Sequence, residues 1–241
     1  MCGRYGQTPE KLRHYVSQRK LRALQTSIQF DGNKYLVPGN DTYSIGYNKE
    51  GDFIPIIGKF LYRPYYAPKL SWINARAEGK NGKEKLNEED DPSYSGPYRL
   101  AEQSGSSAAV RKNRCIIPVD YFIEGSKEDG LQHPYLIRRK DQAPFGLAGF
   151  YGYTNNVAGI CIVTTPAAEL LHQVVKHHRS PFVLTEDEEG TWLDPELTEP
   201  EKIDQLFHPF DSSEFEAIKL ADELPKGKIN NSLKKILKEQ Y

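Results

Sequence analysis

The chain begins Met-Cys-Gly-Arg, and its second residue carries a thiol at a position where unusual chemistry is available. If Met1 is removed, Cys2 holds a free α-amine and a thiol on adjacent carbons. An α-amine has a pKa of about 7.7–8.0, so a useful fraction is unprotonated and nucleophilic at neutral pH. Gly3 lets a substrate approach the backbone closely, and Arg4 lies within reach of a bound anion. We interpret Cys2 as a candidate nucleophile; the alternative is an incidental residue in a loose N-terminus.

A second group of polar residues lies in the segment SWINARAE. Asn74, Arg76 and Glu78 alternate with apolar residues, so their side chains share one face of an extended segment. An arginine on that face presents a planar fork of donors to an oxyanion such as a phosphate. The alternative is an edge strand whose polar side faces water.

Two further residues are suited to proton transfer. Glu124 ends the apolar run CIIPVDYFIE, where partial desolvation raises the pKa of a carboxyl group. His177 and Arg179 fall where a predicted helix gives way to a strand opened by Pro181, and imidazole is the natural general acid or base near pH 7. Because His172 and His177 are five residues apart, they do not share a helix face, and we expect no metal site.

The elements that must position these residues are mostly short strands. Amphipathic spacing predicts a helix over 9–25, turn residues at 48–52 predict a hairpin, and further helices are predicted near both ends of the chain. The segment 79–109 is charged and poor in apolar residues, and we interpret it as a polar surface excursion. The pattern predicts an α+β fold: one domain, residues 1–241, with a largely antiparallel curved sheet or open barrel and flanking helices.

Composition limits the classes of protein that fit. The net charge of -1 means that a nucleic-acid partner would need a local basic face. Cys115 and Cys161 lie in apolar runs and are expected to be buried free thiols, which suits a reducing compartment. The chain has neither a signal peptide nor an apolar run of the ~20 residues that span a membrane, so we expect an intracellular, cytoplasmic protein.

Six short motifs occur in the same order as in one known family. They are MCGRY, VPGN at Pro38, NARAE, RCIIPVDYFIEG, IVTTPAAELL and HHRSP. On these motifs the chain resembles the SRAP family, the SOS-response-associated peptidases, also described as abasic-site processing proteins. It departs from the family pattern at Gly125 and Tyr121, and the tryptophan-rich segment before NAR is replaced by KFLYRPYYAPK.

The resemblance implies a DNA-associated protein that senses abasic sites in single-stranded DNA. In this chemistry the protein first removes its own Met1. The α-amine of Cys2 then attacks the sugar aldehyde to give a Schiff base, and the thiol closes a thiazolidine that crosslinks protein and DNA, protecting the site during the DNA damage response.

The same resemblance assigns roles to individual residues. His177 would donate a proton during ring opening, Glu124 would handle protons at the amine and imine, and Asn74 would hold the terminal residue. The predicted DNA-binding residues are Arg4, Pro38, Arg76 and Arg179, with Tyr65 and Tyr66 as stacking surfaces that Tyr62 or Trp72 could also provide. We expect no cofactor and a monomer.

Two alternatives stay open at the level of sequence. An N-terminal-nucleophile glutamine amidotransferase also opens Cys-Gly in its mature form, although an aliphatic residue usually follows where this chain has Arg4. A noncatalytic single-stranded DNA binder would use the tyrosines and arginines without forming a bond. Ammonia release from glutamine and the heat stability of the DNA complex separate the three possibilities.

Overall fold

The structure is a computed structural model that describes residues 3–21, 24, 35–103, 105–128, 131–220 and 233–234. Met1 and Cys2, the predicted nucleophile, lie outside the described residues. So does most of the C-terminal segment 221–241, where a further helix is predicted.

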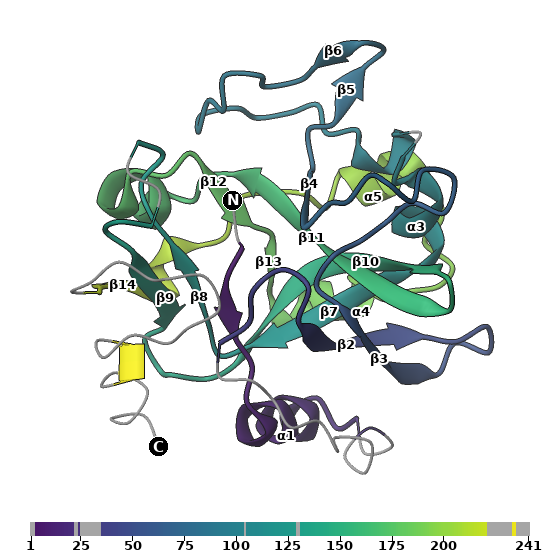
Figure 1. The fold of residues 1–241 in the computed structure, drawn as a ribbon, viewed down its shortest axis with the longest axis horizontal. Helices are drawn as coiled ribbons and strands as arrows, with labels where there is room; N and C mark the ends of the chain where they lie inside the picture. The colour runs from purple at the N-terminus through teal and green to yellow at the C-terminus, as the bar shows by residue number, and fades with distance from the viewer. Residues whose placement is uncertain are drawn as a thin grey trace.

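Strands dominate the structure, as predicted (Figure 1). They are β1 (Tyr5–Gly6), β2 (Asp41–Tyr47), β3 (Phe53–Lys59), β4 (Asn74–Arg76), β5 (Lys80–Asn81), β6 (Glu84–Lys85), β7 (Arg114–Val119), β8 (Tyr121–Glu124), β9 (Tyr135–Arg139), β10 (Phe145–Thr154), β11 (Val157–Pro166), β12 (Arg179–Pro181), β13 (Val183–Leu184) and β14 (Phe215–Lys219). The helices are α1 (Pro9–Gln18), α3 (Ser107–Lys112), α4 (Glu186–Trp192) and α5 (Pro200–Asp204), with short helical turns η1 (Leu100–Glu102), η2 (Leu171–Val175) and η3 (Ser212–Glu214).

The central sheet closes on itself. Strand pairing runs β11, β3, β2, β7, β10 and back to β11, so these strands form a barrel, and β4, β12 and β13 attach to its members. The pairings are antiparallel except those of β11 with β3 and with β4. A second sheet has the order β1, β8, β9, β14. These findings confirm the predicted α+β class with a curved, largely antiparallel sheet, and they add that the barrel is closed.

The apolar runs of the sequence become strands that are covered on both faces. All residues of β7 are buried, and its alternate side chains enter different core clusters: Cys115 and Ile117 lie in one and Ile116 in another. A continuous apolar run, unlike an alternating one, is typical of such a strand. The free thiols of Cys115 and Cys161 are buried, as predicted, and burial raises the pKa of Cys115 to about 12.

The helices differ in extent from their predictions. The Thr8 hydroxyl caps α1 by accepting from the Lys11 N–H at 3.4 Å, but the helix ends at Gln18, and Lys20 has a left-handed φ of 56°. The helix predicted before His177 contains the single π-helical turn η2. Within the described residues, no helix has the length and apolar composition needed to cross a membrane.

Candidate active site

Strand pairing brings together segments that are far apart in the sequence. β1 pairs with β8, and the Ile123 N–H donates to the Arg4 carbonyl at 2.8 Å, so Arg4 lies beside the end of β8 that carries Glu124. β4 and β12 both pair with the last residues of β11, where Arg76 is opposite Thr164 and Arg179 is opposite Pro166. The two groups of segments meet where His177, just before β12, contacts Glu124 at the end of β8.

A cavity of about 470 Å³ lies at this convergence. It is lined by Gly3, Arg4, Arg76, Asp90, Ile123, Glu124, Gly125, Ser126, Lys127, Leu131, His177, His178 and Arg179. The predicted site residues Arg4, Arg76, Glu124, His177 and Arg179 thus share one cavity, and Gly3, which follows the predicted nucleophile, lies on its wall.

An imidazole and a carboxylate face each other in the cavity. His177 Nε2 lies 3.4 Å from Glu124 Oε2, and the two side chains are 12% and 5% exposed. His177 Nδ1 lies 2.8 Å from the carbonyl oxygen and 3.1 Å from the amide nitrogen of Arg179, which fixes the ring. Burial lowers the pKa of His177, and the negative charge of Glu124 opposes that shift. The imidazole and the carboxylate are therefore in the direct contact that acid–base chemistry requires.

Arg179 is held by a buried carboxylate. Its two terminal nitrogens lie 2.6 and 2.8 Å from the Glu78 oxygens, and the side chains are 4% and 0% exposed. Arg179 Nη2 also donates to the Thr164 carbonyl at 2.9 Å. The guanidinium predicted to contact a phosphate is thus engaged within the protein, in a bidentate pair that joins β12 to the end of β4.

Asn74 is two residues before Arg76 on β4, so both side chains project from the same face of the strand. Neither amide atom of Asn74 has a hydrogen-bond partner among the described residues, although both atoms are buried. Leaving a buried amide unsatisfied costs free energy, and a catalytic role is one explanation for such a group.

The other predicted arginines differ in exposure. Arg4 is 9% exposed, and its guanidinium carbon lies 5.9 Å from the centre of the Tyr35 ring. The Arg76 side chain is 28% exposed and lies 2.8 Å from the carboxylate of Asp90. Arg76 is therefore the more accessible of these two cations.

The three remaining predicted residues lie at the surface and do not line this cavity. Pro38 is in an exposed turn beside Gly39, whose φ is +92°. Tyr65 and Tyr66 are 79% and 53% exposed, and their rings pack edge to face with centres 5.5 Å apart. They offer exposed aromatic surface on the connection between β3 and β4.

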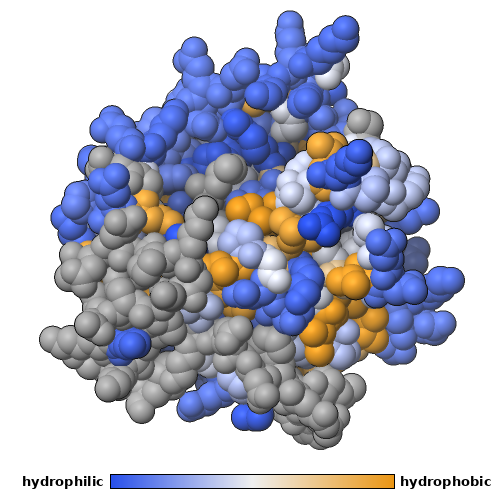
Figure 2. Space-filling model, in the orientation of Figure 1, coloured by the Kyte–Doolittle hydropathy of each residue, from blue (hydrophilic) through white to orange (hydrophobic). Residues whose placement is uncertain are grey.

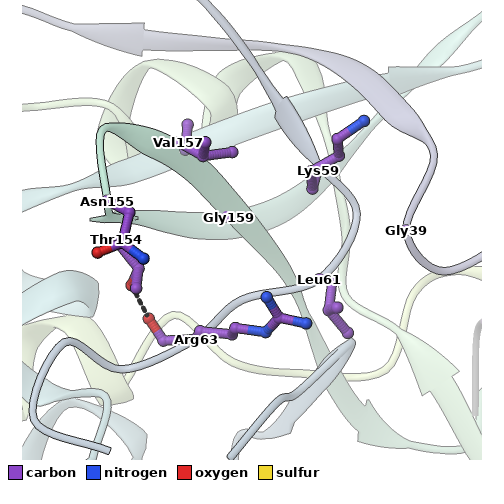
Figure 3. Close-up of a pocket in the computed structure, with 9 residues that line it drawn as sticks. Gly39, Lys59, Leu61, Arg63, Thr154, Asn155, Val157 and Gly159 are labelled. Carbon is purple, nitrogen blue, oxygen red and sulfur yellow. Dashed lines mark hydrogen bonds between the residues drawn. The ribbon is translucent and has the colours of Figure 1, made fainter. Parts of the chain in front are cut away.

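A second cavity, of about 380 Å³, lies between the Gly39 turn and the β10–β11 hairpin (Figure 3). Arg63 and Lys59 extend along it, and the Thr154 hydroxyl donates to the Arg63 carbonyl at 2.9 Å. The described residues that line it include no carboxylate, imidazole or thiol. The predicted proton-transfer residues Glu124 and His177 line the first cavity, which is therefore the candidate active site.

Two residues of the active-site network were not predicted from the sequence as site residues. Glu78 belongs to the NARAE motif, but its pairing with Arg179 depends on a residue 101 positions later. Asp90 lies in the charged excursion among other acidic residues, so nothing in the sequence distinguishes its carboxylate from those of its exposed neighbours. Among the described residues, no group of three or more His, Cys, Asp or Glu side chains is arranged to hold a metal ion.

Comparison with known proteins identifies the family. The family model described as SOS response associated peptidase (SRAP) matches residues 99–226, more than half of the chain. Two Bacillus subtilis proteins, each named abasic site processing protein, are similar: YoqW is 32% identical over 139 residues, and YobE is 31% identical over 128 residues. These matches cover 55% and 51% of this chain, and they span about three fifths of those relatives, 61% and 58%.

The fold is also similar to solved structures. A protein from Bacteroides thetaiotaomicron has a TM-score of 0.64 at 20% identity, covering 91% of this chain and 92% of that one. A protein from Bordetella bronchiseptica has a TM-score of 0.63 at 20% identity, covering 91% and 99%. The sequence match over more than half of the chain carries the assignment: this protein belongs to the SRAP family of SOS response associated peptidases.

Proposed function

We propose that the protein processes abasic sites in DNA, and that it does so by crosslinking itself through Cys2 to the opened sugar. The observation that carries this proposal is the shared cavity of Gly3, Glu124 and His177. Cys2 directly precedes Gly3 in the sequence. The names of the Bacillus subtilis relatives, abasic site processing proteins, support the same substrate class.

The reaction begins after removal of Met1, which the protein itself would carry out. The free α-amine of Cys2 adds to the aldehyde carbon of the abasic deoxyribose, and loss of water gives an imine. The thiol sulfur then adds to the imine carbon, and the thiol proton ends on nitrogen, which closes a thiazolidine ring. No oxidant or cofactor is required for these steps.

Glu124 and His177 are the groups proposed to move protons in this sequence. His177 would protonate the ring oxygen of the sugar as it opens, and Glu124 would take protons from the attacking amine and return them to the departing water. Their contact of 3.4 Å allows one to restore the protonation state of the other. Asn74, whose buried amide has no partner among the described residues, is proposed to hold the terminal residue.

The remaining predicted residues are proposed to bind single-stranded DNA around the reacting sugar. Arg4 and Arg76 would contact phosphates, so affinity should fall as salt rises. Arg179, engaged by Glu78, would support the site from within the protein. Tyr65 and Tyr66 would stack on bases, because base stacking tolerates any aromatic plane, and Pro38 would line the path of the strand.

A denaturing gel tests the proposal. Untagged protein mixed with single-stranded DNA bearing one abasic site should give a slow-migrating adduct that survives boiling in detergent, and Cys2→Ala should give none. Cys2→Ala and Cys2→Ser both keep the α-amine once Met1 is removed, so either should give a stable adduct only after borohydride reduction of its imine. Cys2→Ser is the closer control, because it replaces only the sulfur. Equal adduct from wild type and Cys2→Ala would overturn the mechanism.

Two companion measurements separate the alternatives. Mass spectrometry of the protein as produced should show that Met1 is absent. Ammonia release from glutamine would indicate an amidotransferase instead, and a DNA complex that dissociates on boiling would indicate a noncovalent binder.

A further inference from the structure

The polar excursion that follows β4 folds back onto the active site. The β5–β6 hairpin stands away from the barrel (Figure 1), on the hydrophilic upper part of the face in Figure 2. The chain then turns at Asn87 and Asp90, which have left-handed φ values of 50° and 60°. The Asn87 side chain accepts from the Asp91 N–H at 2.6 Å and donates to Glu78 at 3.1 Å, which fixes the turn against the buried Glu78–Arg179 pair.

This turn places a carboxylate on the most accessible arginine of the cavity. Asp90 Oδ1 lies 2.8 Å from Arg76 Nη2 and 3.4 Å from Arg179 Nη1. The Asn87 carbonyl accepts from the same Arg76 nitrogen at 2.5 Å. Asp90 lines the active-site cavity with Glu124 and His177, and its side chain is 22% exposed.

We propose that Asp90 is an internal competitor for DNA, occupying in the free protein the position beside Arg76 that a DNA phosphate takes in the complex. This inference rests on the proposed function, since it assumes that Arg76 binds a phosphate. Carboxylate and phosphate oxygens accept the same hydrogen bonds from a guanidinium. While Asp90 is in place, Arg76 presents little net charge to a DNA strand.

The two ion pairs of the network differ in how easily they separate. The Glu78–Arg179 pair is buried, and removing either partner would leave a charge in a dry environment. The Asp90–Arg76 pair is partly exposed, so water can solvate Asp90 once it is displaced. An incoming phosphate would therefore displace Asp90 and leave Glu78 where it is.

An opposite role for Asp90 is also chemically reasonable. A carboxylate beside an arginine can orient its guanidinium for a ligand, and its loss then weakens binding. The two roles predict changes of opposite sign on replacing Asp90, so one affinity measurement decides between them.

The experiment measures noncovalent affinity by fluorescence anisotropy, using the full chain and single-stranded DNA with a tetrahydrofuran abasic analogue, which lacks the aldehyde. Asp90→Asn should tighten binding by about two- to five-fold, the size expected of a partly exposed ion pair. Glu89→Gln is the matched control, because it removes the same charge from the exposed neighbouring position and should leave affinity within error. In an Arg76→Ala background, Asp90→Asn should have no effect.

Several outcomes would overturn the proposal. Weaker DNA binding by Asp90→Asn would show that Asp90 orients Arg76. Equally tight binding by Glu89→Gln would show that the gain comes from the change in net charge and not from the position of Asp90. Hydrogen exchange gives a second test on the unaltered protein: amides over 86–91 should exchange faster when DNA is bound, and unchanged protection would contradict displacement. If the wild-type protein forms the covalent adduct but Asp90→Asn binds DNA no more tightly, only the inference about Asp90 fails. If the wild-type protein forms no adduct, the proposed function fails as well.

Discussion

His177 and Glu124 face each other across the candidate active site, with imidazole Nε2 3.4 Å from carboxylate Oε2. The backbone of Arg179 holds the opposite side of the imidazole ring. Burial lowers the pKa of His177 and Glu124 opposes the shift, so the charge of His177 depends on Glu124. The pair should therefore respond as a unit when either residue is replaced.

Replacing Glu124 with Gln should slow adduct formation by about 10²–10⁴-fold, the usual contribution of a positioned acid or base. The same change removes the negative charge that raises the pKa of His177, so the imidazole should titrate at lower pH than in wild type. Quench-flow gels measure the rate and NMR the titration. Glu128→Gln, an exposed change four residues later, should alter neither quantity.

Breaking the buried Glu78–Arg179 pair should strongly destabilise the fold. Glu78→Gln removes the buried bidentate partner of Arg179 and leaves only the Asp90 carboxylate at 3.4 Å; breaking a comparable buried pair costs about 3–5 kcal/mol. Urea denaturation measures the loss. In contrast, Lys202→Gln breaks an exposed pair with Glu199 and should cost about 0–1 kcal/mol; equal losses for the two variants would contradict the importance of burial.

Asn74→Leu should separate stability from activity. The side chains are similar in shape, and the change removes two buried polar atoms that have no partner among the described residues. The free energy of unfolding should stay the same or rise by up to about 1–3 kcal/mol, while the adduct yield falls. Asn81→Leu, at an exposed position on β5, should leave the adduct yield unchanged. A large loss of stability in Asn74→Leu would mean that the Asn74 amide makes hydrogen bonds in the folded protein.

Asp204 should make stability depend on pH. Burial raises the pKa of this carboxyl group from 3.8 to about 7, and its Oδ1 accepts from the Ala101 N–H at 2.9 Å. Between pH of about 4 and 7 the folded state binds more protons than the unfolded state. The contribution of Asp204 to stability is thus full below about pH 4 and is lost as pH rises through about 7, with a slope of up to about 1.4 kcal/mol per pH unit.

Asp204→Asn keeps an acceptor for Ala101 and removes the titration. Thermal melts across this pH range should fall less steeply in Asp204→Asn than in wild type, with the largest gain above pH of about 7. Glu50→Gln, an exposed change in the β2–β3 turn, should follow the wild-type profile. Parallel profiles for wild type and Asp204→Asn would mean that the carboxyl group titrates normally.

The sequence predicted the parts of the fold that depend on local pattern. The turn at 48–52 joins β2 to β3, and Asn48 accepts from the Asp52 N–H at 2.8 Å, as expected of a polar hairpin turn. The end of α1 was not predictable, because Leu21 and Leu24 continue the apolar spacing and no glycine or proline occurs between Gln18 and Gly32 to stop the helix. The left-handed conformation of Lys20 ends it instead.

For the site, motif order identified residues that the structure brings together: Arg4, Arg76, Glu124, His177 and Arg179 line one cavity. The sequence could not show which of these cations is already neutralised within the protein. That depends on two ion pairs. Arg179 meets Glu78 because β4 and β12 both pair with β11, and Arg76 meets Asp90 because the chain turns back at residues with left-handed φ values. A sequence shows the sign of each charged side chain but not the residue with which it pairs.

The distance along the chain between Glu78 and Arg179 also sets an order of events during synthesis. The ribosome adds roughly 5–20 residues per second, so the 101 positions between them take on the order of 5–20 s. Until the arginine is made, burying the glutamate would leave its charge uncompensated. The nascent N-terminal half should therefore keep this segment in contact with water, and the catalytic centre should be among the last regions of the newborn protein to mature.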